Sequence, residues 1–193
     1  MPLVVFEGID GCGKKTQILK LTRLLNSHNF SFSLYKYPAR KTPLLHSHLS
    51  GKISLDSRTL FFLFSLDILA EQENIRADLA KGKTVILDRY ILSTIAYSSS
   101  NPSFADAKKI ALSLNFIPPD KIFLLDVPPA ISQKRKALQK KLDTYEANLP
   151  LLSATRKNYL SLCKERFLCK NWVRIDAGRK KEEVFKEIAK HFK

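Results

Sequence analysis

The sequence predicts an α/β fold with one sheet of five parallel strands and helices on both of its faces. Five short runs rich in β-branched and aromatic residues recur along the chain, and longer segments with the apolar spacing of helices separate them. Parallel strands need crossover connections, which helices supply, so this alternation indicates a mainly parallel sheet. The expected strands are 3–6, 32–35, 84–87, 122–125 and 172–175.

Helical spacing marks the segments between these strands. One helical face consists of Ile18, Leu21, Leu24 and Leu25, and another of Leu60, Leu63, Phe64, Asp67, Ala70, Glu71 and Asn74. The second face predicts one long helix that ends before Gly82, with Phe61 and Phe62 in the core. The lysine-rich stretch at about 134–149 has no strand pattern and is expected to form a small lid.

Length and composition indicate a single domain over residues 1–193. The chain is 45% hydrophobic and 26% charged, and no stretch approaches the length of apolar sequence that spans a membrane. We therefore expect a cytoplasmic protein. Its three cysteines have no metal-ligand spacing and cannot all pair, so we expect reduced thiols. Residues 130–193 hold 17 Lys and Arg against 7 Asp and Glu, which is +10 of the net charge of +15. A polyanionic partner such as nucleic acid stays open but is not favoured, because no aromatic-and-basic motif accompanies the charge.

The strongest signal is a glycine-rich loop directly after the first strand. The spacing Gly8-x-x-x-x-Gly13-Lys14 between an apolar strand and a helix is that of a P-loop, which binds the phosphates of ATP through backbone N–H groups, the helix N-terminus and its lysine. The sequence therefore predicts the P-loop NTPase fold. The residues expected to contact ATP are Gly8, Ile9, Asp10, Gly11, Cys12, Gly13, Lys14, Lys15 and Thr16.

One position departs from the P-loop pattern. A Ser or Thr normally follows the lysine and ligates Mg²⁺, whereas this chain has Lys15 there and Thr16 next. A residue one step along a helix points about 100° away, so Thr16 is no obvious substitute. Three alternatives stay open: Mg²⁺ held through water and carboxylates, partial replacement of its charge by Lys15, or reduced activity.

Two phosphate-bearing substrates would need fixed cations and a metal ligand. Arg40 and Arg89 are the candidates for gripping an acceptor phosphate, because a planar guanidinium holds phosphate at two points. Asp88, at the end of an apolar strand, is placed to hold Mg²⁺ or its waters. With Lys14, these residues are the expected catalytic set.

The loop at Glu7 to Gln17 and the tripeptide Asp88-Arg89-Tyr90 together resemble the thymidylate kinase family, and the resemblance spans nearly the whole chain. Further matching segments are Tyr37-Pro38-Ala39-Arg40, Leu63-Phe64-Ser65, Ser93 with Ala96 and Tyr97, Pro119-Asp120 with Leu124 to Val127, and Asp143 with Tyr145-Glu146. The resemblance implies transfer of the γ-phosphoryl group of MgATP to dTMP, and a homodimer.

The resemblance also implies roles on the acceptor side. Asp10 would hydrogen-bond the acceptor sugar and Phe64 would stack on the pyrimidine. The other residues expected at the acceptor are Arg40, Arg89, Ser93, Tyr97 and Tyr145. Arg135 is the lid arginine that would reach the ATP phosphates, with lysines near it.

One difference from the family bears on the choice of base. The family usually has an arginine that reaches the thymine edge where this chain has Ile68. Ile68 therefore leaves open a kinase for another pyrimidine monophosphate such as dUMP. Two further alternatives stay open: a nucleic-acid-associated ATP-binding protein, because of the net charge of +15, and a nucleotide-binding protein with little catalysis, because of Lys15.

Overall fold

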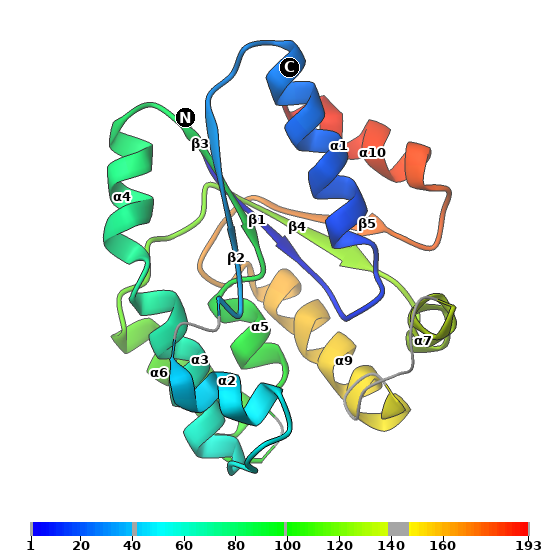
Figure 1. Cartoon of the computed structure of the whole chain (residues 1–193). Coiled ribbons are helices and arrows are strands. Elements are labelled where there is room, and N and C mark those ends of the chain that lie inside the picture. The colour runs from blue at the N-terminus through cyan, green and yellow to red at the C-terminus, as the bar shows by residue number, and fades with distance from the viewer. Residues whose placement is uncertain (1, 40–41, 99, 139–146, 193) are drawn as a thin grey trace.

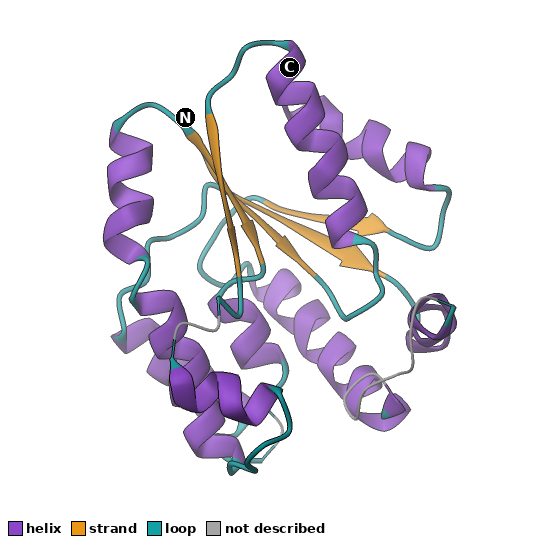
Figure 2. Ribbon diagram, viewed as in Figure 1, coloured by secondary structure: helices purple, strands orange, loops and turns teal. Residues whose placement is uncertain are grey.

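The computed structural model describes residues 2–39, 42–98, 100–138 and 147–192. Its centre is a five-stranded, entirely parallel sheet with the strand order β2-β3-β1-β4-β5 (Figures 1 and 2). The strands are β1 (Leu3–Glu7), β2 (Phe32–Lys36), β3 (Thr84–Asp88), β4 (Lys121–Asp126) and β5 (Trp172–Asp176). The predicted sheet is confirmed, and each strand ends one residue later than expected.

Helices cover both faces of this sheet, as Figure 1 shows. Helices α1 and α10 pack against each other on one face, while α4, α5 and α9 lie on the other. The helices are α1 (Lys14–Ser27), α2 (Pro43–Leu49), α3 (Ser57–Leu69), α4 (Gln72–Ala80), α5 (Ile91–Ala96), α6 (Phe104–Ser113), α7 (Pro129–Ala137), α9 (Leu149–Glu165) and α10 (Lys181–Ala189), followed by a short 3₁₀ turn, η1 (Lys190–Phe192).

Burial follows the position of each strand in the sheet. The central strands β1 and β3 are buried along their whole length, because they have a neighbour on each side and helices on both faces. The edge strands β2 and β5 are largely half-buried or exposed. The ends of β1 and β3, which carry the candidate site, are thus fixed by the best-packed part of the core.

The prediction of one long helix before Gly82 was wrong. The chain forms two helices instead, because α3 ends at Leu69 and α4 begins at Gln72. At the junction the Glu71 N–H donates to the Ile68 carbonyl (3.2 Å), a tighter turn than an α-helix makes. The break redirects α4 along β3, which it contacts.

Two further expectations concern the lid and the membrane. The start of the predicted lid belongs to α7, which runs to Ala137, and residues 139–146 lie outside the described residues. Within the described parts of the chain, no helix combines the length and the apolar character that crossing a membrane requires.

Candidate active site

The candidate site lies at the carboxyl edge of the sheet, where all five strands end on the same side. The glycine loop leaves β1 there and enters α1, while Asp88 and Arg89 follow β3, the hydrogen-bonded neighbour of β1. Ligands of open parallel sheets bind outside this edge. The parallel register therefore brings together residues about 80 positions apart along the chain.

Close packing and left-handed backbone explain the first two glycines of the loop. Gly8 has φ +138°, and a Cβ there would lie 2.5 Å from the Leu125 carbonyl oxygen and 2.9 Å from Cys12 Sγ. Gly11 has φ +80°, and its Cβ would lie 2.6 Å from the Ser132 carbonyl oxygen on α7. The loop is thus held between β4 and α7, and the Ser132 hydroxyl donates to the Asp10 carbonyl.

Lys14 turns back into the loop. Its ammonium donates to the carbonyls of Gly8 (2.7 Å) and Ile9 (3.3 Å) and lies 3.6 Å from Cys12 Sγ. Gly13 precedes α1 at φ 101°, and no side chain caps this helix N-terminus within the described residues. An uncapped helix N-terminus beside a buried ammonium is an arrangement that binds anionic phosphate.

The two residues after Lys14 both face solvent. Lys15 and Thr16 are exposed on the first turn of α1. Throughout the described residues, no group of three or more His, Cys, Asp and Glu side chains is arranged to hold a metal. Among the described residues, no side chain donates a hydrogen bond to the Asp88 carboxylate, which is 8% exposed at the end of β3, so its oxygen atoms can serve Mg²⁺.

Arg89 forms the centre of the acceptor side. It has φ +74°, and its N–H donates to the Phe6 carbonyl (3.0 Å), which fixes the turn after β3 to β1. Its guanidinium donates to Asp10 Oδ1 (2.7 Å) and to the Gly8 carbonyl (3.4 Å), and it lies 5.6 Å from the ring centroid of Tyr97. This side chain, 13% exposed, thereby joins the end of β3 to the phosphate loop.

The positive charges of Arg89 and Lys14 keep the neighbouring Asp10 ionised. Burial raises the pKa of Asp10, but the Arg89 guanidinium and the Lys14 ammonium outweigh it and hold that pKa well below its ordinary value. Tyr97 donates to the second Asp10 oxygen (3.2 Å). Asp10 is therefore an ionised carboxylate that orients Arg89 and Tyr97.

Sequence reasoning missed two residues that hold this arrangement. Glu7, which is fully buried, accepts the Tyr90 N–H and lies within hydrogen-bond distance of the hydroxyl groups of Ser93 and Tyr159. A carboxylate that directly follows four apolar strand residues was the available signal for Glu7. Tyr159 lies on α9 and gave no signal of its own, since aromatic residues occur in several helices and nothing in the sequence marks this one.

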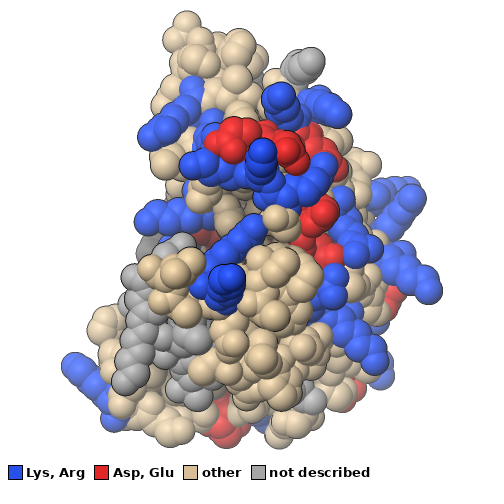
Figure 3. Space-filling model, turned by 90° about the vertical axis from the view of Figure 1, so that its right-hand side faces the viewer, with Lys and Arg blue, Asp and Glu red and all other residues tan. Residues whose placement is uncertain are grey.

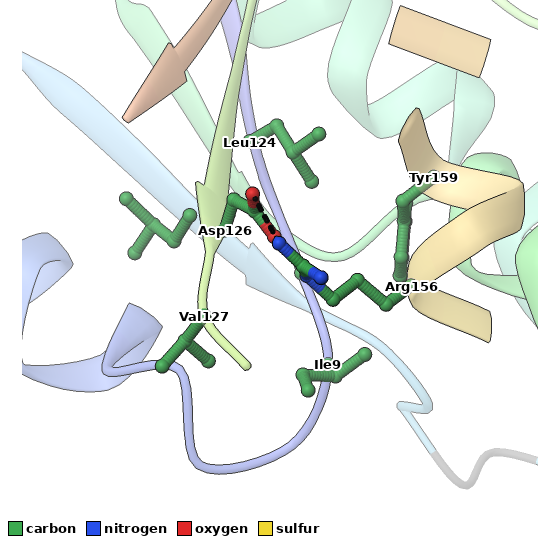
Figure 4. Close-up of a pocket in the computed structure, with 8 residues that line it drawn as sticks. Ile9, Leu124, Asp126, Val127, Arg156 and Tyr159 are labelled. Atoms are coloured by element: carbon green, nitrogen blue, oxygen red, sulfur yellow. Dashed lines mark hydrogen bonds and ion pairs between the residues drawn. The ribbon is translucent and has the colours of Figure 1, made fainter. Parts of the chain in front are cut away.

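A second missed group lies beside the loop in the pocket drawn in Figure 4. Arg156 reaches from α9 to Asp126 at the end of β4, with Nε 2.6 Å from Oδ1 (Figure 4). Arg174 on β5 donates to the other Asp126 oxygen (2.7 Å). Burial raises the pKa of Asp126, but the two guanidinium groups lower it below its ordinary value, so the ion triad ties β4, β5 and α9 together.

Helix α3 carries the predicted acceptor face. Phe64 is half-buried, whereas Asp67 is buried and accepts the Ala39 N–H (2.5 Å), which fixes the segment leading to Arg40. Phe61 is in the core, as expected, but the expectation for Phe62 was wrong, because its side chain is 45% exposed. Adjacent helix residues point about 100° apart, so the two rings cannot share the same face.

Three other residues predicted for the site are Arg40, Tyr145 and Arg135. Arg40 and Tyr145 lie outside the described residues. Arg135 lies on α7 and donates to the Ala177 carbonyl (2.8 Å) and the Gly178 carbonyl (3.4 Å), so its guanidinium rests on the loop between β5 and α10.

The parallel sheet, the phosphate loop with its lysine and the cationic acceptor side beside it define a P-loop phosphotransferase that acts on nucleotides. The family model described as thymidylate kinase matches residues 6–188. The chain belongs to the thymidylate kinase family, whose members are nucleoside monophosphate kinases.

Similar proteins come from distant organisms. A thymidylate kinase of Plasmodium falciparum is 30% identical over 190 residues, which cover 97% of this chain and 87% of that protein. One from Leptospira borgpetersenii is 33% identical over 193 residues, covering 98% and 92%. One from Fervidobacterium nodosum is 32% identical over 201 residues, covering 98% and 97%.

Proposed function

We propose that this chain is a thymidylate kinase that transfers the γ-phosphoryl group of MgATP to dTMP, giving dTDP and ADP, and that residues 1–193 form one kinase domain. The observation that carries the proposal is the position of Arg89, which donates both to Asp10 and to the Gly8 carbonyl of the phosphate loop. A cation that bridges the donor loop and the acceptor side is what the transfer between two anionic nucleotides requires.

In this proposal each side of the site has a separate task. Lys14 leaves the loop carbonyls and, with the N–H groups of the loop and of the α1 N-terminus, binds the ATP phosphates. Arg89 and Arg40 orient the acceptor phosphate. Its oxygen is already anionic, so no general base is needed, and positioning with charge neutralisation carries the catalysis.

Magnesium fits the donor side through Asp88. A bound Mg²⁺ would neutralise charge on the outer phosphates, and the Asp88 carboxylate would hold the ion or its waters. Asp88 follows the buried strand next to β1, so its position is fixed relative to the loop. Arg135 and lid closure would complete the enclosure of the phosphates and exclude water as a competing acceptor.

The acceptor base would lie against α3. Phe64 would stack on the pyrimidine, Tyr97 would close the sugar side, and Asp10 would receive the sugar hydroxyl. Ile68, where the family usually has arginine, is 1% exposed and lies in the core, so it offers no polar contact to the base. Thymine and uracil have the same polar edge and differ only in the C5 methyl group, so the choice between dTMP and dUMP depends on apolar contacts to that methyl group.

An acceptor panel tests the substrate directly. ADP formation from MgATP is measured with dTMP, dUMP, UMP, CMP, AMP and GMP offered separately. The proposal predicts the highest turnover with dTMP and little with the purine nucleotides, whereas comparable turnover of dTMP and dUMP would favour a kinase for another pyrimidine monophosphate. ATP binding without turnover of any acceptor would refute the proposal and favour a non-catalytic or nucleic-acid-associated protein.

The charge distribution gives the nucleic-acid alternative little support. On the face shown in Figure 3, lysines and arginines surround a group of acidic side chains. Ion pairs on the α1 and α10 surface include Lys20 with Glu182 (3.7 Å) and Arg179 with Glu187. Among the described residues of this face, acidic partners thus neutralise part of the basic charge, which weakens its attraction for a polyanion.

Lys15→Thr should strengthen the use of Mg²⁺. The substitution places a hydroxyl at the position that normally ligates the ion, on an exposed site where the change costs little stability. We expect the Mg²⁺ concentration at half-maximal rate to fall by about tenfold, the value of one added ligand contact of about 1.4 kcal/mol. Valine has nearly the shape of threonine but no hydroxyl group, so Lys15→Val is the matched control. Equal behaviour of the two variants in a Mg²⁺ titration would contradict the expectation.

We also propose a homodimer that forms through α3. Phe62 and Leu66, four residues apart on α3, are 45% and 49% exposed, and exposed apolar side chains at this spacing form one face of a helix. Leu44 on the neighbouring α2 is 46% exposed. Phe62→Glu with Leu66→Glu should convert a dimer to a monomer in sedimentation velocity, whereas Leu19→Glu, on α1 and 48% exposed, should not. A monomeric wild-type protein at micromolar concentration would contradict the proposal.

A further inference from the structure

The buried carboxyl group of Glu7 has a role in the site that its sequence position does not indicate. Glu7 ends β1, is 0% exposed and directly precedes the first glycine of the phosphate loop. Its Oε1 accepts the Tyr90 N–H (2.8 Å), so it holds the backbone of the turn that carries Arg89. One carboxyl group thereby joins the two loops on which donor and acceptor would meet.

The other oxygen of Glu7 belongs to a ring of three oxygen atoms. Glu7 Oε2 lies 2.6 Å from Ser93 Oγ and 2.8 Å from the Tyr159 hydroxyl, and these two hydroxyls lie 2.8 Å from each other. All three separations are hydrogen-bond distances for oxygen atoms. Each of the three contacts therefore needs a proton of its own.

The number of protons available to this ring determines the protonation state of Glu7. Ser93 and Tyr159 supply one hydroxyl proton each, which serves two contacts and leaves two oxygen atoms facing each other without a proton. The Arg89 guanidinium donates to the Ser93 hydroxyl (3.0 Å) and the Tyr159 hydroxyl (3.4 Å) from outside the ring, so it does not fill the third contact. A proton on the Glu7 carboxyl completes the ring, with each oxygen donating once.

The surroundings of Glu7 agree with this count. Burial raises the pKa of Glu7 above its ordinary value, although the charge of Arg89, the hydrogen bonds with Ser93 and Tyr159 and the charge of Lys14 act in the opposite direction. Burial likewise holds the pKa of Tyr159 well above its ordinary value, so that hydroxyl keeps its proton. Asp10 takes the ion pair with Arg89, at 2.7 Å, which leaves Glu7 without a direct guanidinium contact among the described hydrogen bonds.

We infer that Glu7 is a positioning residue, held as a neutral carboxylic acid, and that its ring with Ser93 and Tyr159 fixes the Arg89 guanidinium between the phosphate loop and Asp10. Tyr159 brings α9 into this ring, and Ser93 brings α5. Arg89, with φ +74°, occupies a left-handed backbone conformation that is unfavourable outside glycine, and the Glu7 contact to the next N–H helps to hold it. The catalytic consequence rests on the proposed function, whereas the protonation state does not.

Infrared spectroscopy tests the protonation state without any substrate. The difference spectrum between the wild-type protein and Glu7→Gln at neutral pH should contain the C=O stretch of a protonated carboxyl group, and the band should move to lower frequency in D₂O. Asp78→Asn is the matched control, because Asp78 pairs with Lys83 (2.8 Å) and Tyr35 on the surface and should lose only ionised carboxylate bands. Ionised carboxylate bands alone in the Glu7 difference would overturn the inference.

Kinetics test the positioning role. Glu7→Ala should lower kcat by about 100-fold, the effect of a reacting group displaced by about 1 Å, while the KM for ATP changes by less than about threefold. Glu7→Gln keeps an acceptor and a donor in the same shape and should recover most of the lost kcat. Glutamine that behaves like alanine, or alanine with an unchanged kcat, would overturn the inference.

A milder variant covers the case in which Glu7→Ala does not fold. Tyr159→Phe removes the hydroxyl group from the hydrogen-bonded ring and leaves the packing of the aromatic side chain in place. We expect kcat to fall by about tenfold with ATP affinity unchanged. An unchanged kcat would count against the positioning role. A wild-type protein without turnover of any nucleotide would refute the proposed function instead, and the infrared result would still decide the state of Glu7.

Discussion

Arg89→Ala is expected to abolish most of the phosphoryl transfer while leaving ATP binding largely intact. The guanidinium is the charge that joins the acceptor side to the loop, since it donates to Asp10 Oδ1 (2.7 Å) and to the Gly8 carbonyl (3.4 Å). Fixed arginines at transferring phosphoryl groups contribute about 10³-fold or more to kcat, so a loss of about that size is predicted. Steady-state kinetics with dTMP, together with equilibrium binding of an ATP analogue, give the two quantities separately.

Two companion variants make the Arg89 result specific. Arg89→Lys keeps the charge but loses the planar geometry, so its kcat should fall between those of the wild type and the alanine variant. Arg76→Ala removes an exposed arginine of α4, which pairs with Glu73 three residues before it, and should leave kcat unchanged. Retained turnover in Arg89→Ala, with a folded protein, would remove Arg89 from the catalytic set.

Gly8→Ala is expected to have the largest effect on stability. A Cβ at Gly8 would lie 2.5 Å from the Leu125 carbonyl oxygen, and the φ of +138° is one that alanine rarely adopts. Backbone strain and overpacking each cost about 1–3 kcal/mol, so we expect a loss of about 3 kcal/mol, or about 6–12 °C in Tm for a chain of this size. The Lys14 ammonium is anchored on the carbonyl of this same residue (2.7 Å), so ATP affinity should fall as well.

Gly82→Ala separates strain from steric contact. Gly82 has φ +73°, but a Cβ there would meet nothing within 4 Å, and the residue lies between α4 and β3, away from the loop. This variant should cost about 1 kcal/mol and leave ATP affinity unchanged. Thermal unfolding and nucleotide titration of both variants decide the point, and equal losses for Gly8 and Gly82 would contradict the role of close packing.

The sheet and the phosphate loop were predictable because local sequence determines them. Buried strands leave short apolar runs, and the loop needs glycine and lysine at fixed spacing, so both signals survive in a single sequence. The break after Leu69 was not predictable, since no proline or glycine marks it and the packing of α4 on β3 decides the direction. The opposite orientations of Phe61 and Phe62 likewise depend on which side of α3 meets the core.

The supporting contacts of the site depend on tertiary structure. Glu7 meets Tyr159 across 152 positions of the chain, and Asp126 meets Arg156 across 30, so neither pair has a local pattern. Motif reasoning finds residues that face a ligand, because ligand chemistry dictates their type and spacing. It misses the groups that hold those residues in place, because many arrangements of polar side chains can do so.

The transfer itself can be observed by following the γ-phosphoryl group. ATP labelled in its γ-phosphate is incubated with Mg²⁺, dTMP and the wild-type protein, and the label is located by separation of the products. We expect one labelled dTDP for each ADP formed and little label in inorganic phosphate, because the proposed closure of the site would exclude water. Label found in inorganic phosphate alone, or no release of ADP in the presence of dTMP, would contradict it.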